Sequence, residues 1–344
     1  MKPLITALVD TYNHEKYIEQ ALVSVLEQGL SPAELEIVVV DDGSTDKTPS
    51  IIQKFAPRVK HLRKKNEGQA SAFNAGFAET SGEIVALLDG DDWWAKGKLA
   101  TVAEALEKNT EVAAVSHGYY EFREGTGEAR VCVPPGKRTV RVDTPEAART
   151  AGSAWRFLLM GALTVRRSVL EWIVPLDEEM VFMADSAIQV AAMIKGVLIL
   201  EEPLFYYRYH AQNLFAMEND EDAERVRRKW KMTELVYSRV HRMVIELGVP
   251  RETASALLED GWMEAKRHRL HKIGGSRWEA FRTEMQCFQL DRPNPSAGYR
   301  LFKYLVVGTA TLLLPARRFY ELRNWYAQRE LGRYRERLVK KQGT

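Results

Sequence analysis

Three carboxylates lie within four positions in the stretch LLDGDDWW, residues 87–94, directly after an apolar run. Asp89 and Asp91 are two residues apart, so in an extended segment their side chains point the same way. Two such charges about 4 Å apart repel by roughly 4 kcal/mol at an effective dielectric constant near 20. Mg²⁺ or Mn²⁺ would remove this conflict, since these ions prefer oxygen ligands and keep positions open for substrate phosphates. Taken alone, however, an acidic cluster at a strand end is more often a solvated turn than a metal site.

A second acidic loop, DDGSTD at residues 41–46, points to a different ligand group. Carboxylates repel phosphate, so Asp41 and Asp42 are better suited to accept hydrogen bonds from a nucleobase or a ribose. The alternative is a glycine turn followed by a helix cap supplied between Ser44 and Thr48. Tyr12, in the loop DTYN, offers a ring on which a base could stack, although an aromatic side chain here is as often packing.

The elements that carry these loops alternate along the first 110 residues. Apolar runs of strand type are followed by segments with the periodicity of amphipathic helices, a pattern that predicts a parallel sheet covered by helices on both faces. Strands are expected at residues 4–9, 36–40, 59–64, 83–88 and 112–122, and helices at 17–28, 48–55, 69–80 and 97–107.

Each of the first four predicted strands ends in a polar loop. The loops are DTYN at 10–13, DDGSTD at 41–46, KKNEG at 64–68 and DGDD at 89–92. In parallel sheets of this kind ligands bind outside the carboxyl ends of the strands. The four loops are therefore expected to meet at one edge and to form a binding site.

The second part of the chain is less regular. Residues 123–150 contain PPGKR and many charges and are interpreted as a hairpin or mobile loop. Sheet-like character returns at 158–170, a helix is expected at 181–196 and a strand at 197–210, and beyond Asn219 the pattern is almost wholly helical.

Composition describes an ordinary globular chain with an uneven charge distribution. The 344 residues carry a net charge of +2, which argues against a polycation that binds nucleic acid. Residues 297–344 contain eleven Lys and Arg against three Glu, so this segment carries +8 and the rest, by difference, about −6. Cys132 and Cys287 have no zinc-type spacing and indicate a reducing compartment, and the N-terminus shows no secretion signal.

The C-terminal segment favours a membrane surface. YLVVGTATLLLP, residues 304–315, is too short to span a bilayer, and basic residues interleaved with Tyr, Trp and Phe flank it. This arrangement suits an interfacial helix on anionic lipid, with a buried or oligomer-forming helix pair as the alternative. We expect a cytoplasmic protein that is peripheral on the inner face of the cytoplasmic membrane and acts on a lipid-linked or membrane-presented acceptor.

Three stretches together carry a family resemblance: DTYNHEKYIEQALVSVLEQ, EIVVVDDGSTDKT and KNEGQASAFNAGFAETSGEIVALLDGDDWW. They resemble the inverting family 2 glycosyltransferases with the GT-A fold, closely over residues 4–115 and more loosely over 155–213. The resemblance implies an α/β fold, a Rossmann-like mixed sheet with a helical C-terminal extension. It divides the chain into a nucleotide-sugar-binding half at 1–115, an acceptor-binding half at 116–215 and a helical region at 216–344, with the membrane-surface helices at 297–344.

The resemblance also implies a nucleotide-sugar donor, expected to be a UDP-sugar, and roles for individual residues. Asp10, Tyr12 and Asp42 fall where the family binds the nucleobase, and Asn66 is grouped with them. Asp89, Asp91 and Asp92 fall on the DXD-type segment that holds ribose, metal and diphosphate. The implied cofactor is Mn²⁺ or Mg²⁺, with Asp91, Asp92 and His210 as its ligands.

Asp185, in MADSAIQ, falls at the position of the family's catalytic base, and the same signature fits a helix N-cap. Arg208 and His210, in EEPLFYYRYHAQN, match the segment that contacts diphosphate or metal. Two positions depart from the family pattern. Ala184 stands where a glutamate is common, and Phe73 stands where an arginine is usual, so phosphate neutralisation would depend on the metal, Arg208, Lys64 or Lys65.

The function that follows is a metal-dependent inverting glycosyltransferase. Trp93 and Trp94 flank the acidic loop, and one of them is a candidate floor for the sugar or acceptor. The two departures keep open a catalytically silent nucleotide-sugar-binding scaffold at the membrane. A dinucleotide-dependent dehydrogenase is excluded because the loop after the first strand, DTYNHEK, has no GxGxxG pattern.

Overall fold

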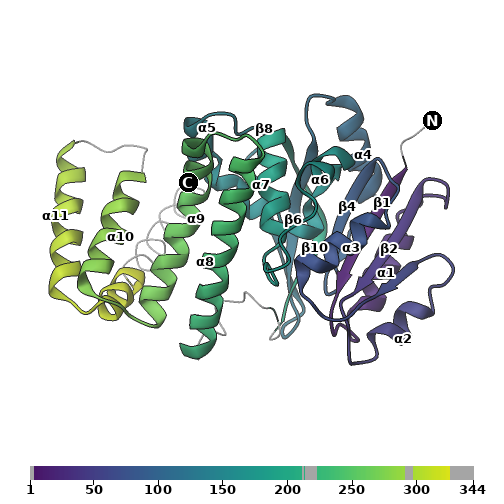
Figure 1. Cartoon of the computed structure of the whole chain (residues 1–344), viewed down its shortest axis with the longest axis horizontal. Helices are drawn as coiled ribbons and strands as arrows, with labels where there is room; N and C mark the ends of the chain where they lie inside the picture. The colour runs from purple at the N-terminus through teal and green to yellow at the C-terminus, as the bar shows by residue number, and fades with distance from the viewer. Residues whose placement is uncertain (1–3, 211–212, 214–222, 291–296, 326–344) are drawn as a thin grey trace, which may run out of the picture. The chain divides into compact units, whose positions relative to one another are not determined.

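A computed structural model describes residues 4–210, 213, 223–290 and 297–325, with side chains outside 288–290 and 297–304 (Figure 1). The chain divides into two compact units. The described residues of 1–216 and 235–258 form unit 1, and those of 217–234 and 259–344 form unit 2. Residues 326–344, the last part of the predicted basic membrane segment, lie outside the described residues.

Unit 1 is built on one mixed sheet with the order β3-β2-β1-β4-β9-β6-β10-β5, in which β7 pairs with β6 and β8 with β10. The strands are β1 (Ile5–Thr11), β2 (Leu35–Asp41), β3 (Lys60–Arg63), β4 (Ile84–Asp89), β5 (Trp93–Trp94), β6 (Ala114–Arg123), β7 (Glu128–Cys132), β8 (Arg138–Val140), β9 (Thr164–Arg166) and β10 (Val197–Tyr209). The first four strands are parallel, as predicted. β9 then lies antiparallel between β4 and β6, which makes the sheet mixed.

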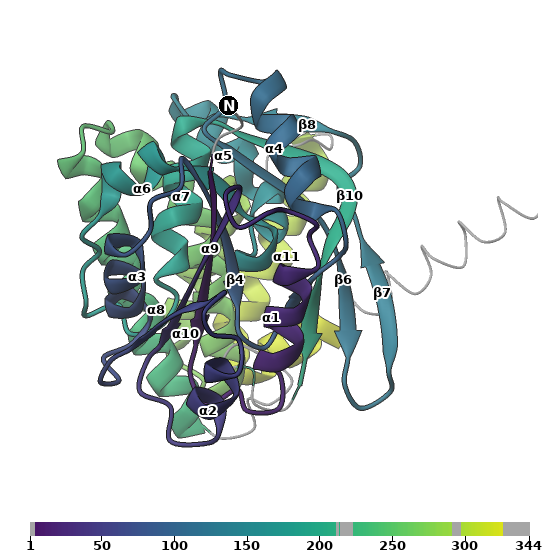
Figure 2. The same ribbon diagram turned by 90° about the vertical axis from the view of Figure 1, so that its right-hand side faces the viewer.

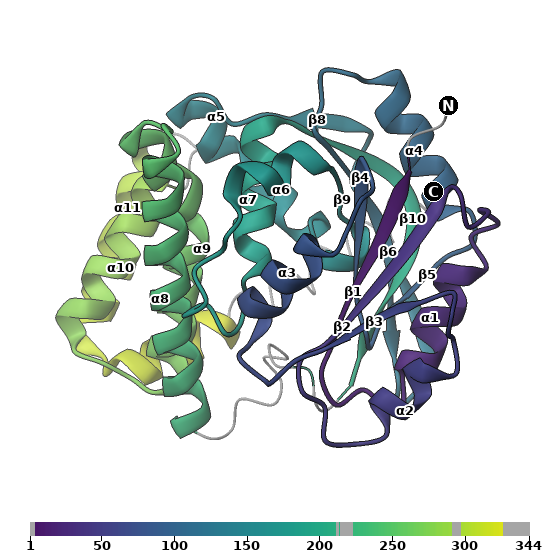
Figure 3. The ribbon, with the colours of Figure 1, turned by 45° about the vertical axis from the view of Figure 1, so that its right-hand side comes forward.

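Helices cover both faces of this sheet. In Figure 3, α3, α6 and α7 lie on one side of the sheet and α1 and α4 on the other. Strands buried on both faces are nearly all apolar, which is why β1, β2 and β4 read as continuous apolar runs. The helices of unit 1 are α1 (Ile18–Leu26), α2 (Thr48–Gln53), α3 (Gln69–Ala78), α4 (Lys98–Lys108), α5 (Pro145–Thr150), α6 (Arg167–Ile173) and α7 (Asp185–Lys195), with short 3₁₀ segments at Ala151–Phe157 and Met160–Ala162.

Two sequence expectations change in detail, and a third is confirmed. The sequence TPSIIQ favours Thr48 as the N-cap and Pro49 as the first helical residue. In the structure Thr48 is the first residue of α2 and Lys47 occupies the N-cap position without a side-chain cap bond, so the predicted cap is one residue too late. The sheet-like run at 158–170 contributes only the three residues of β9, followed directly by α6. Short apolar runs do not distinguish strand from helix by periodicity, which explains this error. The irregular segment at 123–150 does contain a hairpin, in which β7 pairs with the end of β6 beside β10 (Figure 2).

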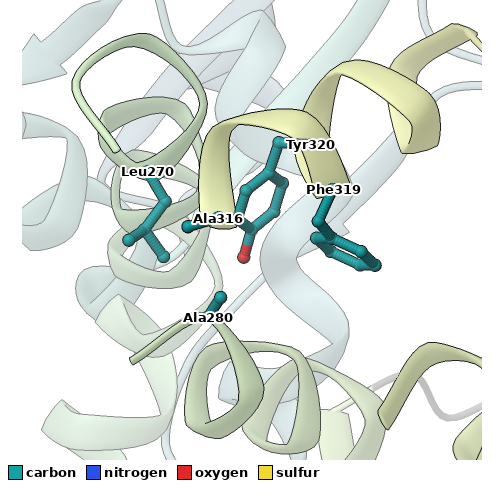
Figure 4. Close-up of a cluster of buried hydrophobic side chains, with 5 residues drawn as sticks. All are labelled: Leu270, Ala280, Ala316, Phe319 and Tyr320. Atoms are coloured by element: carbon teal, nitrogen blue, oxygen red, sulfur yellow. The ribbon is translucent and has the colours of Figure 1, made fainter. Parts of the chain in front are cut away.

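From Ala223 to residue 325, the described part of the chain is almost wholly helical, as the sequence predicted. α8 (Ala223–Glu246) and α9 (Arg251–Lys272) each contribute residues to both units. Within unit 2, α10 (Arg277–Leu290) lies beside α11 (Ala297–Leu313), and residues 316–325 are again helical. Figure 4 shows a buried cluster that joins α9, α10 and this last segment, formed by Leu270, Ala280, Ala316, Phe319 and Tyr320. Among the described residues, no helix has the length and apolar character needed to cross a membrane.

Candidate active site

The four polar loops meet at the carboxyl edge of the sheet, as predicted. Asp10 is the direct partner of Asp89 on the neighbouring strand, and Thr11 is the partner of Asp41. Backbone bonds continue beyond the strands, from the Gly90 N–H to the Asp10 carbonyl at 2.8 Å and from the Lys64 N–H to the Asp41 carbonyl at 3.0 Å. The acidic side chains of three loops are thereby brought to one place.

The buried carboxyl groups at this edge outnumber the positive charges beside them. Burial, followed by the charges of Asp42 and Asp91, raises the pKa of Asp10 to about 8. Burial and neighbouring carboxylates also raise the pKa values of Asp89 and Asp92 well above the ordinary range. Crowded carboxylates of this kind favour a cation or a hydrogen-bonding ligand.

Asp91 is the exception because two histidines face it. The Nε2 atoms of His210 and His14 lie 3.1 Å and 3.9 Å from its Oδ2. Burial acts to raise the pKa of Asp91, but the charge of His14 and the hydrogen bond and charge of His210 outweigh it, and the pKa is lowered. Asp91 is therefore the ionised centre of the acidic loop.

The predicted three-residue metal site is not assembled. Asp92 Oδ1 accepts a hydrogen bond from the Arg208 backbone N–H at 2.7 Å and does not join Asp91 and His210. In the part of the chain that the structure describes, no group of three or more His, Cys, Asp or Glu side chains is arranged to hold a metal ion. Asp91 and His210 alone fit an ion that a substrate diphosphate completes, because Mg²⁺ and Mn²⁺ commonly take only one or two protein ligands beside phosphate oxygens.

Arg208 organises the acidic loop from inside. Its Nε donates to the Asp91 carbonyl and one Nη donates to Gln20 Oε1, both at 2.7 Å. The guanidinium also lies over the rings of Tyr17 and Trp93, 4.7 Å and 4.4 Å from their centroids. The side chain is buried, and these contacts hold the loop in shape, a role that the sequence prediction of a contact with diphosphate or metal did not include.

The two tryptophans have different surroundings. Trp94 is buried and donates its indole N–H to the Gly161 carbonyl at 3.1 Å, which makes it part of the core. Trp93 is half-buried and stacks on Tyr206 with the ring centroids 4.7 Å apart. Tyr206 and the Arg208 guanidinium therefore both lie against the ring of Trp93.

Asp42 anchors the loop between β3 and α3. Its carboxylate accepts hydrogen bonds from Lys64 Nζ at 3.0 Å and from the backbone N–H groups of Glu67 and Gly68 at 3.2 Å and 2.8 Å. Lys64 also pairs with Glu67, so it is not a free phosphate ligand. Asp42 therefore shapes the loop that carries the exposed Asn66.

The remaining predicted nucleotide residues differ in access. Tyr12 is exposed at the end of β1, with 43% of its surface accessible. Asp41 is fully buried, and its Oδ1 accepts a hydrogen bond from the Ser44 N–H at 2.8 Å. The interpretation of Asp41 as a base ligand is wrong, because its carboxylate closes the turn that follows β2.

Asp185 is the first residue of α7 and Ala184 is the cap residue, so Asp185 is not the N-cap that one interpretation gave it. Gln189 donates a hydrogen bond to Asp185 Oδ2 at 2.8 Å and fixes the carboxylate. Burial raises the pKa of Asp185 to about 6, although backbone N–H groups at the helix start act against this. Its charge contributes to the raised pKa of Asp89, which connects Asp185 to the acidic edge.

The segment before α7 is fastened to α3. The Ala184 N–H donates to Gln69 Oε1 at 2.8 Å, and the Gln69 N–H donates to the Val181 carbonyl at 3.0 Å. The Asn74 amide bonds both backbone groups of Leu176, donating at 2.9 Å and accepting at 2.7 Å. α3, which follows the nucleotide loop at 64–68, therefore also positions the start of the helix that carries Asp185.

Packing explains the two departures from the family pattern. Phe73 is buried and lines a small apolar cavity with Leu8, Leu87 and Ile188, so an arginine there would be buried among apolar groups. Ala184 is fully buried.

Sequence reasoning missed several residues of the site. His14 lies beside Asp91, and its position four residues after Asp10 in the first polar loop was the available signal. Tyr17 donates its hydroxyl to Glu124 at 3.0 Å and packs its ring against the Arg208 guanidinium. No local sequence pattern predicts this contact. Gln69 had no sequence signal for its contact with Ala184, which lies 115 residues away.

The mixed sheet with helices on both faces, followed by a helical C-terminal region, has the architecture of the GT-A fold. Residues 6–171 match the family model described as Glycosyl transferase family 2. This match spans about half of the chain, and curated relatives of the chain are named as glycosyltransferases.

A curated relative is similar to the chain in sequence, and two solved structures share its fold. A protein of Nostoc sp. named as an uncharacterized glycosyltransferase is 34% identical over 215 residues, which cover 61% of this chain and 66% of the relative. S. aureus TarS 1–349, solved with UDP-GlcNAc, shares the fold with a TM-score of 0.54, 17% identity and 90% coverage of both chains. The mannosyltransferase PcManGT of Pyrobaculum calidifontis, solved with GDP-Man and Mn²⁺, gives a TM-score of 0.51 at 21% identity, covering 91% of this chain and 88% of its own. The chain thus spans about two thirds of the length of the curated relative and most of the two solved chains.

Proposed function

We propose that the chain is an inverting glycosyltransferase that moves a sugar from a UDP-sugar to an acceptor hydroxyl. The observation that carries the proposal is the carboxylate of Asp185. Its charge helps to raise the pKa of Asp89 at the acidic edge, and burial raises its own pKa to about 6. A general base is most effective when its pKa lies near the working pH. Asp185 is suited to accept a proton from a hydroxyl that approaches a donor bound at this edge.

In the proposed reaction Asp185 takes the proton of the acceptor hydroxyl as the hydroxyl oxygen bonds to the anomeric carbon. The bond between that carbon and the diphosphate oxygen breaks at the same time, and attack from the opposite face inverts the configuration. Gln189 keeps the Asp185 carboxylate in one orientation throughout, because it donates to Oδ2 from the next turn of α7.

We assign donor binding to the loops of the same edge. Tyr12 offers an exposed ring face and Asn66 an exposed amide, while Asp10 and Asp89 accept hydrogen bonds from base or ribose. Asp42 and Arg208 act by holding the loops around the donor. The proposed nucleotide-binding residues are Asp10, Tyr12, Asp42, Asn66, Asp89, Asp91 and Arg208.

Asp91 and His210 are the side chains that would hold Mn²⁺ or Mg²⁺. A bound divalent ion would neutralise the charge that develops on the departing diphosphate. The complexes of TarS with UDP-GlcNAc and of PcManGT with GDP-Man and Mn²⁺ support a nucleotide-sugar donor and a metal for this fold. We choose UDP as the donor nucleotide because the family resemblance implies it and because a carboxylate can accept a hydrogen bond from the N–H of uracil. Guanine offers a similar N–H, so GDP is the competing outcome.

The proposed acceptor is a lipid-linked or cell-surface polysaccharide precursor, reached from the inner face of the cytoplasmic membrane. The basic surplus of residues 297–344 supports this location, since anionic lipid attracts Lys and Arg by about 1 kcal/mol each.

The test combines ligand-induced stabilisation with turnover. Thermal denaturation is followed with UDP, GDP, dTDP, CDP and ADP, each with Mn²⁺, Mg²⁺ or EDTA. A selective nucleotide at a hundredfold excess over Kd stabilises the folded state by about 2.7 kcal/mol. The proposal predicts a metal-dependent rise with UDP and nucleotide release from UDP-sugars that Asp185→Asn abolishes. A rise with a nucleotide but no release from any UDP- or GDP-sugar would favour the silent scaffold, and no rise with any nucleotide would contradict the proposal.

A further inference from the structure

α11 is apolar on two opposite sides. One side faces the core of unit 2, where Gly308 and Thr311 are buried and Val307, Ala310 and Leu314 pack against the buried cluster shown in Figure 4. The other side carries Leu305, Val306, Leu312 and Leu313, which are 56%, 50%, 39% and 69% exposed. Positions separated by one, seven and eight residues lie on one side of a helix, so the four side chains form a single strip.

The exposed apolar surface continues into neighbouring elements of unit 2. Leu322 and Trp325, in the helical segment after α11, are 54% and 53% exposed. Trp278 at the start of α10 is 62% exposed and packs edge-on against Phe281, the ring that lies closest to Gly308 of α11. Of the twelve exposed large apolar side chains among the described residues, seven lie between 278 and 325. Surface apolar groups gathered in this way mark an interaction site.

The charge around the strip selects the partner. Arg317 and Arg318 follow α11 directly and both are exposed. Residues 297–344 carry +8 in all. A second copy of this chain would bring like charges together, whereas a lipid surface with anionic headgroups attracts them. Apolar side chains beside arginines and a tryptophan are the composition of a helix that lies in the plane of a bilayer surface.

We propose that the strip of Leu305, Val306, Leu312 and Leu313, extended by Leu322 and Trp325, docks on an anionic lipid bilayer. α11 lies along the surface with the strip among the acyl chains, and the arginines contact the headgroups. The inference rests on the membrane location proposed above and assigns it to particular side chains. It does not depend on the transfer reaction, because docking needs neither donor nor acceptor.

The test is flotation of the full chain with vesicles of neutral phosphatidylcholine alone or mixed with 30% phosphatidylglycerol, without nucleotide. Leu305→Asp combined with Leu313→Asp places two charges in the strip at sites that are already exposed. The matched control is Val131→Asp combined with Val133→Asp, since these valines are also exposed, at 53% and 44%, on and beside β7 in unit 1. We expect the strip variant to bind anionic vesicles at least tenfold more weakly and the control to bind like the wild type.

A second variant keeps the proposal testable if the strip variant folds poorly. Arg318→Gln is expected to weaken binding to anionic vesicles about fivefold, the equivalent of roughly 1 kcal/mol, and to leave binding to neutral vesicles unchanged. Size-exclusion chromatography of each protein without vesicles identifies the competing occupant. Equal binding of the strip variant and the wild type would overturn the proposal, as would a wild-type dimer that the strip variant converts to a monomer.

Discussion

Asp185→Asn is expected to make the protein more stable and nearly inactive at the same time. The folded structure raises the pKa of Asp185 from 3.8 to about 6, chiefly through burial. The ionised carboxylate is therefore less stable in the folded protein than in the unfolded chain. At pH 8 the difference corresponds to about 3 kcal/mol, an upper limit. Asparagine has the same size, and its carbonyl can still accept the hydrogen bond from Gln189.

The direction of the Asp185 pKa shift determines the pH range in which the carboxylate destabilises the folded protein. The destabilisation is complete above about pH 6, where Asp185 is ionised in the folded state. It declines as the pH falls and is gone below the unfolded value of 3.8, where both states are protonated. The variant should thus unfold with a free energy roughly 1–3 kcal/mol higher than the wild type at pH 8, and with little difference at pH 4.

Urea denaturation at pH 8, 6 and 4 measures this difference as a change in midpoint at constant slope. Sugar transfer is measured at the same time, and loss of the general base should lower it by roughly 10²-fold or more. Transfer by the wild type should fall about tenfold per pH unit below pH 6, because the protonated base is inactive. Asp143→Asn is the control, since it makes the same chemical change at an exposed carboxylate in unit 1.

Two results would refute this reasoning. A midpoint at pH 8 that is unchanged or lower would mean that the carboxylate is not destabilised by burial. Transfer that persists in the variant, with an unchanged pH profile, would remove Asp185 from the role of base.

Three further perturbations test the rest of the site. His210→Ala should raise the Mn²⁺ concentration for half-maximal transfer by roughly 10–100-fold, measured by metal titration after EDTA treatment, and an unchanged requirement would exclude this ligand. Arg208→Lys should lower thermal stability and raise the KM for the donor, because an ammonium cannot reproduce the planar contacts with both rings and the loop carbonyl; wild-type values would contradict the organising role. Gly68→Ala should cost clearly more stability than its control Gly97→Ala. Both glycines have positive φ, but only at Gly68 would a Cβ meet Val181, at 2.5 Å; equal losses in denaturation midpoint would argue against the tight contact between α3 and the segment before α7.

The edge of the sheet was accessible from the sequence because its determinants are local. Apolar runs such as EIVVV specify buried strands, and polar loops follow them directly. Parallel strands put such loops at one edge, so Asp10 and Asp89 could be brought together without knowing a single distance. The register of β9 was not accessible, since three residues inserted antiparallel between β4 and β6 leave no periodic pattern.

The role of each charged group depended on its neighbours and not on its own segment. Asp91 and Asp92 are adjacent in sequence, yet one faces two histidines and the other accepts a backbone hydrogen bond from Arg208. Only tertiary contacts that span 77 to 119 residues separate their chemistry.

By itself the sequence determined the fold class, the family resemblance and the set of acidic loops, because periodicity and motif order are written in consecutive residues. Tertiary structure decided which of those acids stay ionised, which side chains fasten α3 to the start of α7, and which side of α11 stays exposed. These properties arise from burial and from contacts between distant segments, and burial is a property of the packed chain that no short stretch of residues carries alone.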